Sequence, residues 1–197
     1  MRDKWYADNR DLVKWGVLLT LAERHAAMHI LQVLYHRPTK WDHLEIDGEH
    51  VPIPDAVIRH FRRTSAVSSI DATAPIEVMA DTFEDRREYH RAVIDRIRQR
   101  STTPGIVFLD PDTGLASQTP TLDHVLDSEL STLWAGLKSG DVLVFYQHQT
   151  NRNGQPWIPP KKKQFEQAIG LPVGTAKLAR AEKIAQDVVF FYARKAG

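Results

Sequence analysis

The chain of 197 residues contains no cysteine. This absence excludes disulfide bonds, thiolate metal sites and a cysteine nucleophile, and it suits a reducing compartment. An excess of charge of either sign is missing too, because 26 basic residues stand against 25 acidic ones. With no overall field to attract nucleic acid or a membrane, any basic surface must be local.

Long apolar runs are also missing. No stretch approaches the length of a membrane span, and residues 1–6 lack the apolar core of a signal peptide. We therefore expect a soluble, cytoplasmic protein with no membrane partner. No repeat, low-complexity tract or linker divides residues 1–197, and this length suits a single domain with one substantial core.

Helical and strand patterns alternate along the chain. Helices are predicted over residues 11–24, 54–63, 83–100, 122–138 and 161–169, the third of them capped by Asp81 or Thr82. Strands are predicted over residues 29–35, 75–80, 106–109, 141–146, 177–183 and 187–193. The Asp47-Gly48 pair predicts a small hairpin over residues 42–53, and residues 64–74 read as a loop.

This alternation predicts an α/β fold of the Rossmann-like kind. Strands separated by helices form right-handed crossovers and a mainly parallel sheet with helices on both faces. The last two strands are too close for a helical crossover, so they should pair antiparallel. The strand at residues 106–109 should be central and almost fully buried, because central parallel strands are covered on both faces.

The strongest functional signal lies at the end of that central strand. Asp110 and Asp112, separated by Pro111, follow it directly, and an open α/β sheet binds ligands outside the carboxyl ends of its strands. We assign both aspartates a catalytic role. The alternative is that Asp110 caps the next helix and Asp112 is an ordinary turn residue.

A second polar cluster, over residues 146–154, leaves the neighbouring strand. His148 is a third catalytic candidate, while Gln147, Asn151 and Arg152 are candidates for substrate binding. The alternative is a polar loop without chemistry. If the two strands are adjacent, Asp110, Asp112, Gln147 and His148 should converge on one cleft.

A local basic run follows this cluster. Trp157 precedes Lys161, Lys162 and Lys163, and a basic run beside an aromatic ring can hold a phosphate backbone and stack a base. These four residues are candidates for substrate binding, with a solvated helix start as the alternative. The remaining histidines show no ligand spacing, so no zinc site is expected.

Two motifs resemble those of the class I family that methylates N6 of an adenine in large-subunit ribosomal RNA. Residues 11–15, Asp-Leu-Val-Lys-Trp, resemble its Asp-Val-Leu-Lys-His signature, and residues 110–113, Asp-Pro-Asp-Thr, occupy the place of its Asp-Pro-Pro-Tyr motif. The resemblance implies a methyltransferase-type sheet and S-adenosylmethionine as cofactor. It places Asp11 and Lys14 in the cofactor site, on the far wall of the cleft, and makes Asp110 the carboxylate that holds the amine of a nucleic acid or nucleotide.

Departures from that family leave the function open. Asp112 and Thr113 stand where the stacking aromatic belongs, and Tyr35, His36 and Arg37 replace the glycine-rich turn after the first strand. With Tyr35 in the cofactor site, S-adenosylmethionine should bind weakly or not at all.

Three functions are therefore considered. The first is a methyltransferase acting on nucleic acid or a nucleotide. The second is a hydrolase or nuclease in which Asp110, Asp112 and His148 hold Mg²⁺. The third is a non-catalytic binding descendant of the fold.

Overall fold

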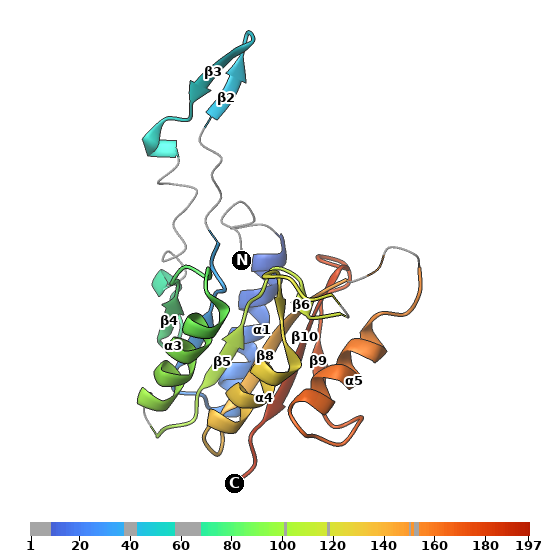
Figure 1. The fold of residues 1–197 in the computed structure, drawn as a ribbon. Coiled ribbons are helices and arrows are strands. Elements are labelled where there is room, and N and C mark those ends of the chain that lie inside the picture. The colour runs from blue at the N-terminus through green and yellow to red at the C-terminus, as the bar shows by residue number, and fades with distance from the viewer. Residues whose placement is uncertain are drawn as a thin grey trace.

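The computed structural model describes residues 9–37, 43–57, 68–100, 102–117, 119–149, 151 and 154–197. Most of the predicted helix over residues 54–63 and the candidate Arg152 lie outside these residues. Figure 1 shows one twisted sheet with α1 (Asn9–His25) on one face and α3 (Arg86–Gln99), α4 (Asp127–Gly136) and α5 (Ile158–Ala168) on the other.

The main sheet has six strands in the order β4-β1-β5-β8-β10-β9. Its parallel strands are β1 (Ile30–Val33), β4 (Ile76–Met79), β5 (Ile106–Leu109) and β8 (Val142–His148). The last two strands, β9 (Lys177–Ala179) and β10 (Val188–Arg194), run antiparallel to each other, and β10 runs antiparallel to β8. The predicted fold class, a mainly parallel sheet that ends in an antiparallel pair, is confirmed.

The core divides between the two faces of the sheet because side chains alternate along each strand. Ile106 and Phe108 of β5 pack under α1 with Leu18, while Val107 and Leu109 pack with α3, α4 and α5. All four β5 side chains are fully buried, as predicted for a central parallel strand.

Two helix starts differ from the prediction. The first turn of α3 begins after Asp85, whose carboxylate accepts the Glu88 backbone N–H at 2.8 Å, so neither Asp81 nor Thr82 is the cap. At α4, the Leu126 N–H donates to Glu129 at 2.8 Å, and the helix starts at Asp127. The residues before it were predicted as helix but form β7 (His124–Val125), paired with β6 (Gly114–Leu115).

A hairpin follows β1 along the chain. The strands β2 (His43–Ile46) and β3 (Glu49–Pro52) meet at Asp47 and Gly48, whose φ angles of 54° and 85° fit the predicted two-residue turn. In Figure 1 this hairpin stands clear of the main sheet. Among the described helices, none is long and apolar enough to cross a membrane.

Candidate functional site

The point where the strand order reverses marks the crevice in which an α/β sheet binds ligands. The chain passes from β1 to β4 on one side of β1 and then returns to β5 on its other side. This switch point lies at the carboxyl ends of β1 and β5. Asp110 lies there, directly after β5, and its backbone N–H donates to the Val33 carbonyl of β1 at 3.0 Å.

Asp110 is held by two donors from different elements. Lys14 Nζ of α1 donates to Asp110 Oδ2 at 2.8 Å and to Asp11 Oδ1 at 2.6 Å. Gln32 Nε2 of β1 donates to the same Asp110 Oδ2 at 2.8 Å. Both of these hydrogen bonds go to Oδ2 of Asp110.

This cluster brings charged groups together in the interior. The Lys14 ammonium group pairs with two carboxylates, and Asp11, Lys14 and Asp110 are all buried. Burial works to lower the pKa of Lys14, but the Asp110 and Asp11 carboxylates outweigh it and the pKa is raised. Burial raises the pKa of Asp110, against the opposing effect of Lys14. Lys14 therefore stays charged. Its Nζ also lies 5.7 Å from the centre of the Tyr146 ring, within the range of a cation–π interaction.

The turn after β1 is made without glycine. Tyr35 has a φ of 49°, in the left-handed region that side chains rarely adopt. Its ring is buried and packs on Phe83 and Tyr89, with centroid separations of 5.3 and 5.4 Å, while its N–H donates to the Tyr89 hydroxyl at 3.0 Å. The ring therefore points into the core, so a contact of Tyr35 with a cofactor would come from its backbone.

Asp81 is a further candidate that the sequence patterns did not single out. It is exposed two residues after β4, the strand beside β1. Burial raises the pKa of the Tyr89 phenol, the hydrogen bond from the Tyr35 backbone opposes this effect, and the Asp81 and Asp110 carboxylates add to it. The sequence signal for Asp81 is an acidic residue just after the strand that neighbours β1. In nucleotide-binding α/β sheets, an acidic residue at this position forms hydrogen bonds with the ribose.

Asp112 and His148 have partners of their own. Asp112 pairs with Arg37 at 2.5 Å, and Arg37 also pairs with Asp123. His148 Nε2 lies 3.1 Å from Asp187 Oδ2, which in turn accepts from Arg10 at 2.5 Å. Among the described residues, Asp110, Asp112 and His148 are each paired with a different residue, and their convergence on one ligand stays a prediction.

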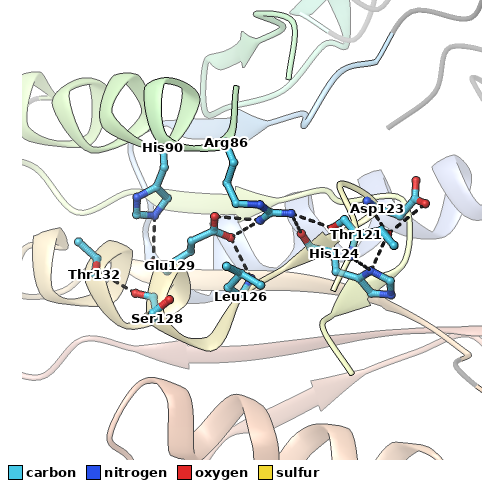
Figure 2. A network of polar contacts seen from close by, with 9 residues as sticks. All are labelled: Arg86, His90, Thr121, Asp123, His124, Leu126, Ser128, Glu129 and Thr132. Carbon is cyan, nitrogen blue, oxygen red and sulfur yellow. Dashed lines mark hydrogen bonds and ion pairs between the residues drawn. The ribbon is translucent and has the colours of Figure 1, made fainter. Parts of the chain in front are cut away.

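The network in Figure 2 fixes the segment that carries Asp123. Arg86 of α3 donates to both Glu129 oxygens, at 2.9 and 2.8 Å, and to the Thr121 and His124 carbonyls at 2.7 and 3.1 Å. The Arg86 guanidinium thus connects α3 with α4 and with the turn before β7. That turn carries Asp123, which forms an ion pair with Arg37.

Gln147 is buried and serves the fold. Its Oε1 accepts the Leu115 N–H at 2.9 Å, and its Nε2 donates to the His148 and Thr113 carbonyls at 2.8 and 3.2 Å. The side chain holds β6 against β8. Its predicted convergence with Asp110 on a ligand stays a prediction.

The lysine run is also partly committed to internal contacts. Lys161 Nζ donates to the Leu115 and Ala116 carbonyls at 2.9 and 3.2 Å, and burial lowers its pKa. Lys162 lies 3.5 Å from the buried Glu166, whereas Lys163 is exposed. The two remaining candidates, Trp157 and Asn151, are partly buried, Trp157 against the core.

No metal cluster is found in the part of the chain that the structure describes. No three histidine or acidic side chains there lie close enough together to hold a metal ion. The predicted Mg²⁺ ligands Asp110, Asp112 and His148 do not form such a group. They pair with Lys14, Arg37 and Asp187, respectively.

No family model and no curated protein matches the chain. Two similar solved structures are a "putative methyltransferase" from Thermobifida fusca YX and a DUF574 family protein from Streptomyces avermitilis MA-4680. The first is 16% identical, with a TM-score of 0.46, over 96% of this chain and 80% of that one. The second is 11% identical, with a TM-score of 0.44, over 95% of this chain and 82% of that one.

Proposed function

We propose that this protein is an S-adenosylmethionine-dependent methyltransferase that acts on an amine of a nucleotide or nucleic acid. The observation that carries the proposal is the hydrogen bonding of Asp110 at the switch point of the sheet. Lys14 and Gln32 both bind Oδ2, and in this proposal Oδ1 accepts an N–H from the ligand. A buried carboxylate oriented in this way suits an exocyclic amine.

The residues around the crevice fit the cofactor. Asp81 is an exposed acceptor for ribose hydroxyls. At Tyr35 the backbone turns in the left-handed conformation, and the buried ring points away from the proposed cofactor site. Gln32 Oε1 is buried beside Asp110 and accepts no hydrogen bond from the described residues. Bound S-adenosylmethionine would supply an electrophilic methyl group. Because the turn lacks glycine, we expect its binding to be weak.

In this proposal, Asp110 orients the substrate amine and stabilises the positive charge that develops on its nitrogen. Lys14 and Asp11 position Asp110 and do not touch the substrate. Two of the three lysines of the 161–163 run make internal contacts. The described surface therefore favours a substrate of nucleotide size over a long nucleic acid.

Titration calorimetry tests the cofactor site. The chain should release heat on titration with S-adenosylmethionine, and Asp81→Asn should weaken binding about tenfold, the effect of losing one charged hydrogen bond. Asp95→Asn is the matched control, because Asp95 is an exposed acid on α3. A titration that shows Mg²⁺ binding and no S-adenosylmethionine binding would replace the proposal with the hydrolase.

Methyl transfer tests the catalytic carboxylate separately. With radiolabelled S-adenosylmethionine and mixed nucleotides, Asp110→Asn should lose transfer while it keeps cofactor binding, because the amide cannot carry the negative charge. Equal transfer by Asp110→Asn and the unchanged protein would remove Asp110 from the chemistry.

A further inference from the structure

The described part of the chain contains an exposed hairpin arm, residues 43–57, that is strongly acidic and has one apolar face. Leu44 and Ile46 lie on the same side of β2, and the register places Val51 opposite Leu44 and Glu49 opposite Ile46. Leu44 and Ile46 are 44% and 49% exposed. A two-stranded hairpin with an uncovered apolar face is marginal in water.

The charge of the arm has one sign. Its acidic residues are Glu45, Asp47, Glu49 and Asp55, and it contains no lysine or arginine. All four acids are exposed, and none pairs with a described residue. The arm therefore suits a surface that is both apolar and cationic.

Such a surface lies along the outer side of α1. A groove of about 410 Å³ runs between this helix and the β9–β10 end of the sheet. Its apolar lining includes Leu12, Val17, Leu178, Ala179, Ile184 and Tyr192. Leu12 and Ile184 are 65% and 47% exposed, so this lining is open to a partner.

The charged residues at the groove include more cations than anions. Arg24 lines the groove, and Lys177 and Lys183 directly precede its lining residues Leu178 and Ile184. Arg24, Lys177 and Lys183 make no ion pair with the described residues. Of the nearby acids, Glu182 is paired with Arg180 at 2.8 Å, and Glu23 precedes Arg24.

We propose that the acidic arm of one copy of this chain docks in the cationic groove of a second copy. The two surfaces are complementary in both charge and apolarity, whereas a groove placed against another groove would bring like charges together. The helix side of the groove presents Gly16, beside which a Cβ would find no atom within 4 Å, so there is room for an approaching strand. Reciprocal docking would give a closed, two-fold dimer.

Disulfide trapping tests the contact, since the chain contains no cysteine of its own. Ile46→Cys chains are mixed with Ile184→Cys chains under mild oxidation, and a covalent heterodimer is expected. Asp95→Cys replaces Ile184→Cys in the matched control, because α3 lies on the opposite face of the sheet. The Ile46→Cys/Ile184→Cys double variant is run in parallel. Cross-linking within one chain only, or no cross-linking, would overturn the proposal.

A charge exchange tests the electrostatic part. Lys177→Glu should raise the dimer dissociation constant about tenfold in sedimentation equilibrium, and added Glu49→Lys should restore most of the affinity. Lys163→Glu, an exposed lysine of α5, is the control and should leave the constant unchanged. A sedimenting monomer at all concentrations, or no effect of Lys177→Glu, contradicts the proposal.

Discussion

Lys14 is the residue on which the geometry of the candidate site most directly depends. Its ammonium group is buried between two carboxylates, one on its own helix and one 96 residues away after β5. Removing one partner of a buried ion pair is costly because the other charge then lacks compensation.

Lys14→Met should therefore lower the free energy of unfolding by about 3 kcal/mol. Urea unfolding followed by circular dichroism measures the change. Lys163→Met removes an exposed lysine and should stay within about 0.5 kcal/mol of the unchanged protein. An equally small change for Lys14→Met would mean that Asp110 is neutral in the folded state.

A second residue-scale prediction concerns acid. His29 lies 3.0 Å from Arg100 Nη1, and Arg100 also pairs with the buried Asp141 at 2.7 Å. Burial, and next the Arg100 guanidinium, lower the pKa of His29. The unfolded imidazole, with a pKa of about 6.5, therefore binds protons more readily than the folded one.

Stability should accordingly fall as the pH drops below about 6.5, where the unfolded state gains protons first. The comparison is between urea unfolding at a pH of about 7.5 and at about 5.5. His29→Gln should reduce this loss, and His50→Gln, an exposed residue of the arm, should not. Part of the dependence should persist, because burial also lowers the pKa values of His25 and His124. Identical pH dependence in His29→Gln would contradict the assignment.

At the scale of elements, β6 is held against the sheet by a glycine and a glutamine that fit together. Gly114 has a φ of 122°, and a Cβ there would lie 2.4 Å from Gln147 Oε1. Gln147 in turn bonds both sides of Gly114.

Gly114→Ala should destabilise the protein by about 1–3 kcal/mol, the usual range for a forced displacement in a packed site. Gly136→Ala is the matched control: a Cβ on this α4 residue meets Ile97 at 3.9 Å, so the change should be neutral or stabilising by up to about 1 kcal/mol. Thermal unfolding of both variants measures the difference. Equal melting temperatures of the two variants would show that β6 can shift to make room for the added methyl group without loss of stability.

The sequence predicted the elements whose signal is local. The apolar run before Asp110 predicted β5, and Asp47-Gly48 predicted the hairpin turn, because each depends on neighbouring residues. The pairing of His148 with Asp187 depends on the antiparallel register of β8 and β10, in which Gln149 N–H meets the Asp187 carbonyl at 2.8 Å. The internal contacts of Gln147 and Lys161 depend on β6. This strand has only two residues, which is too short to show an alternating pattern of apolar and polar residues in the sequence.

At the scale of the whole molecule, docking of the arm between copies would make folding stability depend on protein concentration. We expect the melting temperature to rise with concentration over a hundredfold range. Leu44→Ser/Ile46→Ser should abolish the rise, whereas Leu122→Ser, at an exposed apolar residue far along the chain, should preserve it. A melting temperature independent of concentration in the unchanged protein would contradict arm exchange.

The arm lies within the 34–75 segment that joins β1 to β4, two strands that are direct neighbours in the sheet. The chain-entropy cost of closing such a loop grows only with the logarithm of its length, by roughly 0.6 kcal/mol for each doubling. Insertions or deletions at the arm therefore leave the sheet almost as stable as before. This part of the chain can consequently change in length and sequence at little thermodynamic cost to the sheet, while the ends of β1 and β5 stay as they are.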